Sequence, residues 1–155
     1  MGAFVWHEWA QLVATTASVY GVWSAYYGIF YRKVFWDFIG GTLRAPGGLQ
    51  PSAAIVPLTN IIVRMPLIQL VSFFVCMVVL AIELPAPGFK SMSARFGWVP
   101  RIAMLLIQAV LTALYYQGTN AAIWSVIAAF GYAMAQMNGE KRADGKGGRV
   151  GRSAA

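Results

Sequence analysis

The sequence predicts an all-α fold, a multi-pass transmembrane bundle of four helices. Hydrophobic residues make up 59% of the chain and charged residues 11%, against roughly 45–50% and about 25% in soluble globular domains. Four long apolar runs follow one another, and the last two form one tract, residues 102–139, that carries no Lys, Arg, Asp or Glu. Because a soluble core cannot absorb so much apolar surface in a chain of 155 residues, the composition predicts lipid as the solvent of these helices.

The first predicted helix covers residues 9–30, which is enough to cross a hydrocarbon core that requires about 20 residues. At about 100° per residue its small side chains fall on one face; they include Ala14, Ala17, Gly21, Ala25 and Gly28. Small residues let a second backbone approach closely, and packing drives helix association in lipid. This face is therefore predicted to meet another helix, although small residues are also common in membrane helices generally.

The segment after the first helix carries signals of an interface. Arg32 and Lys33 follow the helix directly and are expected among lipid headgroups. A proline- and glycine-rich turn at 46–51 precedes Ser52, a candidate helix cap. One straight helix over 52–84 would measure about 50 Å, so we expect a kinked or interfacial leg at 52–64 and a membrane helix at 65–84. Arg64 is expected at the edge, because a central arginine costs about 2.5–3.5 kcal/mol.

The last two predicted helices cover 99–116 and 120–138. Pro100 suits the first turn of the third helix, and Arg101 is expected at the lipid interface. Gly118 and Asn120 are expected to make the turn, with Asn120 a candidate cap of the fourth helix. Small residues recur every fourth position there, the pattern of a close helix crossing: Ala121, Ser125, Ala129 and Ala133.

Residues 1–138 are thus predicted to form a single transmembrane domain, followed by a basic, glycine-rich and disordered tail at 139–155. Lys141 and Arg142 of this tail are further candidates for headgroup contacts. More cations lie on the side of the two termini than on the opposite side, which predicts that both termini are cytosolic. Arg32 and Lys33 oppose this orientation, because they follow the first helix and no cation precedes it.

His7 and Glu8 are the most reactive-looking pair of the sequence. They are adjacent, so they do not share a helical face, and the chain holds no second histidine for a zinc site of the H-E-x-x-H type. An aromatic anchor at the interface, formed with Trp6 and Trp9, is the preferred interpretation. The only cysteine, Cys76, permits no intramolecular disulfide.

Polar residues inside the predicted helices are few. Gln69 and Gln108 are expected to form hydrogen bonds between helices rather than to contact a substrate. The acids Asp37 and Glu83 fall at helix ends, so no acid is expected within a helix core, where it would mark an ion path. We therefore predict no catalytic residue, no cofactor site, no metal site and no small-molecule substrate.

Several stretches of the sequence resemble a family of uncharacterised fungal, largely basidiomycete, small integral membrane proteins. They are Trp6-His7-Glu8-Trp9-Ala10, Tyr31-Arg32-Lys33 with Phe35-Trp36-Asp37-Phe38, Pro46-Gly47-Gly48-Leu49-Gln50-Pro51 and Tyr116-Gln117-Gly118-Thr119-Asn120-Ala121-Ala122. The resemblance covers about residues 4 to 137. It implies a eukaryotic membrane protein of unknown function, and it transfers no functional residue to this chain.

The functional expectation is a non-enzymatic integral membrane protein that acts through partners, as an organising or accessory subunit. Its partners are membrane lipids and other membrane proteins or further copies of itself. Nucleic acid is excluded as a partner because the cations of this chain, net charge +7, flank apolar segments. A eukaryotic endomembrane or the plasma membrane is favoured over mitochondria. The alternative is a small oligomeric transporter or channel, with a path between protomers lined by Gln69, Gln108 or the pair Thr15 and Thr16.

Overall fold

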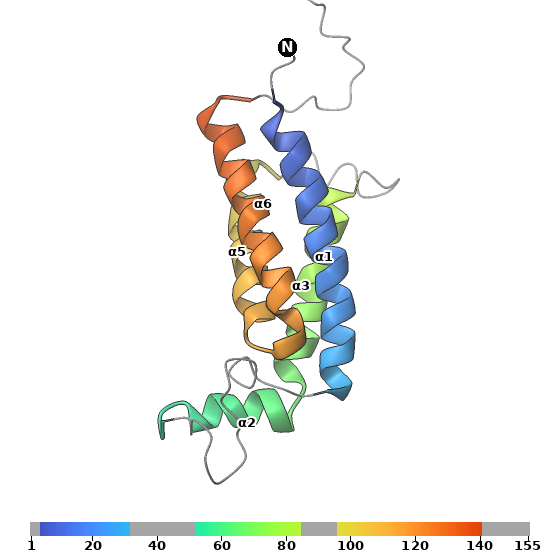
Figure 1. The fold of residues 1–155 in the computed structure, drawn as a ribbon, viewed down its shortest axis with the longest axis vertical. Helices are drawn as coiled ribbons and strands as arrows, with labels where there is room; N and C mark the ends of the chain where they lie inside the picture. Colours follow the sequence, from blue (N-terminus) through green and yellow to red (C-terminus); the bar gives the residue numbers. More distant parts are fainter. Residues whose placement is uncertain (1–3, 32–51, 85–95, 141–155) are drawn as a thin grey trace, which may run out of the picture.

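Four helices stand side by side in the structure, a computed structural model that describes residues 4–31, 52–84 and 96–140. They are α1 (Trp6–Phe30), α3 (Leu67–Glu83), α5 (Trp98–Ala113) and α6 (Thr119–Met137) (Figure 1). A short helix, α2 (Val56–Arg64), lies across one end of the bundle, and the single-turn 3-10 helix η2 (Tyr116–Gly118) joins α5 to α6. The predicted all-α bundle of four packed helices is confirmed.

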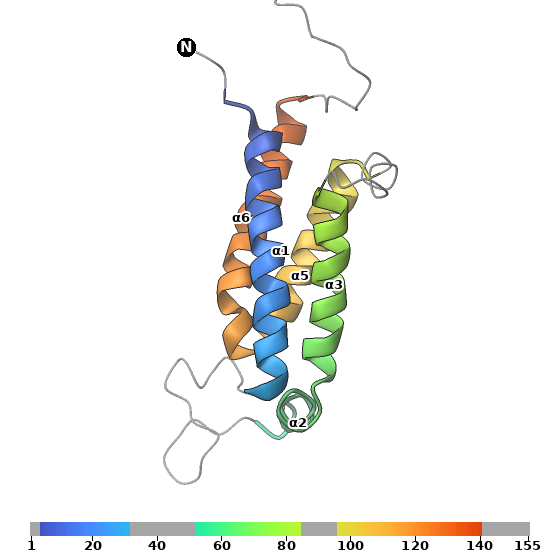
Figure 2. The same ribbon diagram turned by 90° about the vertical axis from the view of Figure 1, so that its right-hand side faces the viewer.

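Around the bundle, α1 packs against α3 and α6, and α5 completes the ring by packing against α6 and α3. Figure 2 shows α2 end-on beneath the bundle, roughly perpendicular to the four long helices. The start of α1 and the end of α6 lie at the opposite end (Figure 1). The structure thus has two distinct ends, which we call the α2 end and the terminal end.

Two helix starts differ from the sequence expectation. α1 begins at Trp6 rather than at residue 9, since the backbone N–H groups of Trp6 and His7 donate to the carboxylate of Glu140. α2 begins at Val56 rather than at 52. Ser52 was expected to cap this helix with its side chain, but only its backbone carbonyl accepts hydrogen bonds there.

The connection between α5 and α6 also differs in detail. α5 ends at Ala113 instead of 116, because Tyr115 adopts an extended backbone, with φ −124° and ψ 148°, before the turn of η2. Asn120 was expected to cap α6, but it lies inside the first turn of the helix, which begins at Thr119. The Thr119 hydroxyl donates to the carbonyl of Tyr116 and tightens the turn.

Small side chains fill much of the interior of the bundle, and many large apolar side chains lie on its surface. The interior is built largely from alanine, serine, glycine and glutamine, whereas large apolar side chains point outward from all four long helices. Trp23, Phe74, Val110 and Phe130, one from each helix, are 58–65% exposed. Soluble bundles place such residues along the stripe that faces the core.

Helix length is the other quantity that bears on the predicted crossing of a membrane. The four long helices contain 25, 17, 16 and 19 residues in chain order. Within 4–31, 52–84 and 96–140, none of the helices combines the length and the apolar character that a membrane span requires.

Candidate functional site

A buried ion pair occupies the core near the terminal end of the bundle. Arg101, in the first turn of α5, donates from Nη1 to Oε2 of Glu83 at 2.6 Å. Tyr132 of α6 donates its hydroxyl to the same carboxylate oxygen at 2.5 Å, and the Arg101 guanidinium carbon lies 5.8 Å from the centre of the Tyr132 ring. All three side chains are at most 2% exposed. Three helices are therefore joined by one carboxylate.

The burial of Arg101 corrects its predicted place at the lipid interface. Its guanidinium is turned inward by acceptors on the neighbouring helix end: besides Glu83, the carbonyls of Ile82 and Phe96 accept from Nη2 and Nε. Glu83 does end α3 as expected, but it is buried rather than excluded from the core. The sequence signal for this pair is the presence of opposite charges at the facing ends of two consecutive antiparallel helices. The sequence prediction treated the two residues separately.

The cluster continues outward to the first residues of α1. The Trp98 ring stacks on Tyr132 with 5.6 Å between ring centres, and the His7 ring lies 5.6 Å from that of Trp98. His7 Nδ1 is 2.8 Å from Oε2 of Glu140. His7 thus joins the start of α1 to Trp98 through a ring contact and to Glu140 through a hydrogen bond.

The Glu140 carboxylate acts as a cap for α1. Limited desolvation raises the pKa of Glu140, but the backbone N–H and the side chain of His7 and the backbone N–H of Trp6 lower it by more, so the pKa lies below its ordinary 4.5. A negative charge at a helix N-terminus also interacts favourably with the helix dipole. The arrangement favours the ionised carboxylate, and through it the first turn of α1.

A second polar layer crosses the middle of the bundle. Gln108 of α5 accepts from the hydroxyl of Ser18 on α1 at 3.2 Å and donates to the hydroxyl of Ser125 on α6 at 2.8 Å. Gln69 of α3 is fully buried, with its side chain against Gly28 of α1. Both glutamines lie inside the four-helix bundle, so neither lines a path between protomers packed on its outer surface.

A third polar contact lies closer to the α2 end. The Tyr115 hydroxyl is 3.0 Å from Oγ of Ser72 on α3 and 3.4 Å from Oγ of Ser24 on α1. All three side chains are at most 3% exposed. Like the other two layers, this contact ties several helices together inside the bundle.

The predicted small-residue faces of the first and fourth helices lie inside the bundle, where these helices pack. On α1 and α6 these residues are buried, apart from a half-buried Ala133: Ala14, Ala17, Gly21, Ala25, Gly28, Ala121, Ser125 and Ala129. The approach is closest at Gly21, where an added Cβ would lie 2.6 Å from Sγ of Cys76 on α3. The small faces are thus occupied by contacts within one chain.

Of the residues expected at lipid headgroups, the structure places two. Arg64 is exposed at the end of α2, and Arg101 is buried. Arg32, Lys33, Lys141 and Arg142 lie outside the described residues, as do Asp37 and nearly all of the predicted tail. In the three described ranges, no three His, Cys, Asp or Glu side chains gather into a group that could hold a metal ion.

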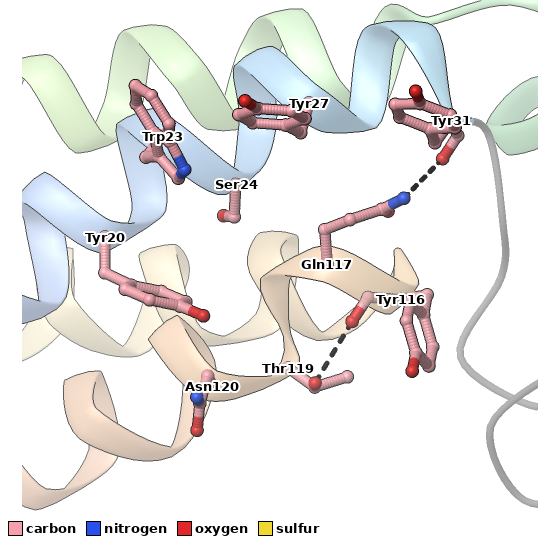
Figure 3. A pocket seen from close by; sticks show the side chains of 9 residues that line it. All are labelled: Tyr20, Trp23, Ser24, Tyr27, Tyr31, Tyr116, Gln117, Thr119 and Asn120. Carbon is pink, nitrogen blue, oxygen red and sulfur yellow. Dashed lines mark hydrogen bonds between the residues drawn. The ribbon is translucent and has the colours of Figure 1, made fainter.

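A pocket of about 400 Å³ lies between the C-terminal part of α1 and the connection from η2 to α6. Its wall on α1 consists of residues at helical spacing, and η2 and the start of α6 supply the opposite wall (Figure 3): Tyr20, Trp23, Ser24, Tyr27, Tyr31, Tyr116, Gln117, Thr119 and Asn120. The amide of Gln117 donates to the carbonyl of Tyr31 at 2.6 Å and ties the two walls together. We call this the aromatic pocket.

The sequence contained a signal for the aromatic pocket that was not recognised. Tyr20, Trp23, Tyr27 and Tyr31 recur every three to four residues, which places them along one helical face. What the pattern could not supply was the opposite wall, because Tyr116 approaches only through the turn of η2.

Comparison with known proteins places the chain in a family. The family described as "Domain of unknown function (DUF7727)" matches residues 1–140, so the chain belongs to it. No curated protein and no solved structure matches the chain. Membership of an uncharacterised family was predicted and is confirmed, while the match carries no information on a fungal source or a membrane location.

Proposed function

We propose that this chain is a non-enzymatic protein embedded in a membrane, where it acts as an organising or accessory subunit for other membrane proteins. One observation carries the proposal: large apolar side chains lie on the outside of the bundle, while small and polar side chains make up much of its inside. Phe74 of α3 is 65% exposed, whereas Glu83, near the end of the same helix, is 1% exposed.

The energetics of the outer surface favour lipid as its surroundings. Burying one large apolar side chain is worth about 1.5–3 kcal/mol, and the outward surface carries many of them, among them Leu12, Trp23, Phe74, Val110 and Phe130. A soluble monomer rarely exposes contiguous apolar patches of more than a few hundred square ångströms. Lipid would cover this surface without requiring any other protein.

The interior is consistent with the same proposal. Polar groups inside a lipid-embedded bundle have no water to bind and must find partners within the protein. Arg101 and Tyr132 both donate to Glu83, and Gln108 accepts from Ser18 on α1 and donates to Ser125 on α6. These donors therefore find acceptors within the chain, which is what a hydrocarbon environment requires of them.

Helix length and hydropathy set the conditions under which the bundle would fit a bilayer. The mean hydropathy of α1 includes Ser18 and Ser24. Both side chains are buried, so neither contributes to the outer surface of the bundle. α3, with 17 residues, measures about 25 Å, and a bilayer can thin locally at a modest cost per ångström. α2 lies crosswise and exposes Val56, Leu58 and Ile61, which suits a helix in the interfacial plane.

The arrangement also bears on what the protein does in the membrane. Gln69 and Gln108 are buried within the chain, so the structure offers no support for a transport path lined by them. Because the small-residue faces are occupied within the bundle, a partner would meet large outward side chains instead. α1 begins and α6 ends at the same end, which agrees with both termini lying on one side, proposed to be cytosolic, of an endomembrane or the plasma membrane.

Cysteine accessibility in liposomes tests the membrane placement. In a Cys76→Ala background, one chain carries Phe74→Cys on the middle of α3 and a matched chain carries Phe4→Cys before α1; these phenylalanines are 65% and 58% exposed. A water-soluble maleimide should label residue 4 and leave residue 74 unmodified until detergent is added. Equal labelling at the two positions in intact liposomes would overturn the placement.

The accessory role is tested separately, by covalent capture of neighbours. A photo-crosslinking residue at Phe74 should link the full chain to a defined membrane protein or to a second copy, whereas one at the buried Val79 should link only within the chain. Repeated recovery of the uncrosslinked monomer from native membranes, with both positions alike, would argue against a partner.

A further inference from the structure

We propose that the aromatic pocket binds the quaternary ammonium headgroup of a choline lipid. This inference deepens the proposed function and rests on it, because a lipid ligand presupposes a membrane-embedded bundle. Three features of the pocket support the proposal: its aromatic rings, the charge of its lining and its level in the bundle.

The aromatic rings of the lining come from two elements. On α1, the ring centres of Trp23 and Tyr27 lie 5.0 Å apart, and the rings of Tyr27 and Tyr31 are stacked at 6.5 Å. Figure 3 shows Tyr116 on the η2 side of the pocket, beyond Gln117 from Tyr31, and the lining also includes Tyr20 of α1. Aromatic rings that line one open space are the groups that recognise quaternary ammonium ions.

The charge of the lining selects among possible ligands. None of the nine lining residues is charged, so within 4–31, 52–84 and 96–140 the lining offers an anion no cationic side chain. The polar groups are hydroxyls and neutral amides, including Ser24, Gln117, Thr119 and Asn120, which can bind phosphate and ester oxygens. A sterol would be better served by long apolar side chains than by this lining.

The level of the pocket fits a lipid headgroup. Tyr31 and Gln117 lie at the α2 end of the bundle, where the crosswise α2 would mark the membrane surface. Tyrosine and tryptophan are enriched at that depth of a bilayer. The volume of about 400 Å³ is within the range of small-molecule sites and exceeds what a trimethylammonium group needs.

Native mass spectrometry of the full chain with an equimolar mixture of dioleoyl phosphatidylcholine and dioleoyl phosphatidylethanolamine tests the headgroup preference. The two lipids differ only in the methyl groups on nitrogen. The unmodified chain should retain the choline lipid about threefold to tenfold more than the ethanolamine lipid. Equal retention of both lipids would overturn the assignment.

The chain offers matched tyrosines for the variants. Tyr27→Leu removes one ring of the pocket and should abolish most of the preference, while Tyr27→Phe keeps the ring and should preserve it. Tyr26→Leu is the control, because Tyr26 is the adjacent tyrosine of α1, 51% exposed, and is absent from the lining. An equal loss in Tyr26→Leu and Tyr27→Leu would refute a role for the pocket.

A soluble probe separates this inference from the proposed membrane placement. Phosphocholine alone should bind the detergent-purified chain at millimolar concentration, and more weakly after Tyr27→Leu. That result supports headgroup recognition even if residue 74 proves accessible to the maleimide. Phosphocholine binding that is identical in the unmodified chain and in Tyr27→Leu would overturn the pocket assignment while leaving the membrane placement intact.

Discussion

Removing the cation from the buried pair gives the most direct test of the bundle's interior. Arg101→Met leaves the Glu83 carboxylate buried without the donor that now lies 2.6 Å away. It also removes the Arg101 bonds to the carbonyls of Ile82 and Phe96, at 3.4 and 3.2 Å. Breaking one side of a fully buried pair costs about 3–5 kcal/mol, so we expect the free energy of unfolding to fall by that amount.

Reversible unfolding in mixed detergent micelles, followed by tryptophan fluorescence and circular dichroism, measures this loss. Arg64→Met is the control, since Arg64 is exposed on α2 and its substitution should change stability by no more than about 0.5 kcal/mol. The double variant with Glu83→Gln should recover much of the loss, because no unpaired charge remains buried. A cost below about 1 kcal/mol for Arg101→Met, the size typical of exposed pairs, would refute the burial argument.

Three further outcomes are expected. Gly21→Ala places a Cβ 2.6 Å from Sγ of the buried Cys76, so it should destabilise the bundle by about 1–3 kcal/mol in the same unfolding assay. Adding Cys76→Ala to this variant should restore stability. Unchanged stability of the Gly21→Ala variant would contradict the close packing. Gln108→Leu removes two interhelical hydrogen bonds and should cost about 0.6–2 kcal/mol, whereas unchanged stability would mean that the polar layer contributes nothing. Because the pKa of Glu140 is lowered from 4.5 on folding, its stabilisation is complete above that pH and disappears as the pH falls through the folded value. Hydrogen-exchange protection of the Trp6 amide should follow this titration in the unmodified chain and be insensitive to it in Glu140→Gln.

The helices themselves were predictable because their signals are local. Apolar runs broken by proline and glycine gave four helices and a leg, and the break before α3 falls at Met65 and Pro66, next to the predicted boundary between residues 64 and 65. A boundary is harder to predict where the deciding group is distant in sequence. The start of α1 depends on Glu140, which is 134 residues from Trp6, and no pattern near Trp6 announces it.

The side-chain contacts were harder to anticipate, for a reason that differs between sites. Gln108 was expected to bond between helices because an uncharged amide in an apolar run has few alternatives. Arg101 was placed at the interface because insertion energies describe a lone arginine, and a partner such as Glu83 changes that energy. The aromatic pocket combines a stripe on α1 with Tyr116, which lies 85 residues after Tyr31 in the sequence, so its second wall required the folded chain.

The single thiol gives this protein a built-in reporter. Cys76 is fully shielded, with its sulfur in the gap left by Gly21 at the seam between α1 and α3. A thiol reagent can reach Cys76 only when α1 and α3 separate at this seam. The rate at which the reagent modifies the unaltered chain therefore reports how often the two helices separate spontaneously. Comparing this rate before and after a suspected ligand or companion protein is added would reveal stabilisation of the seam, without any engineered label.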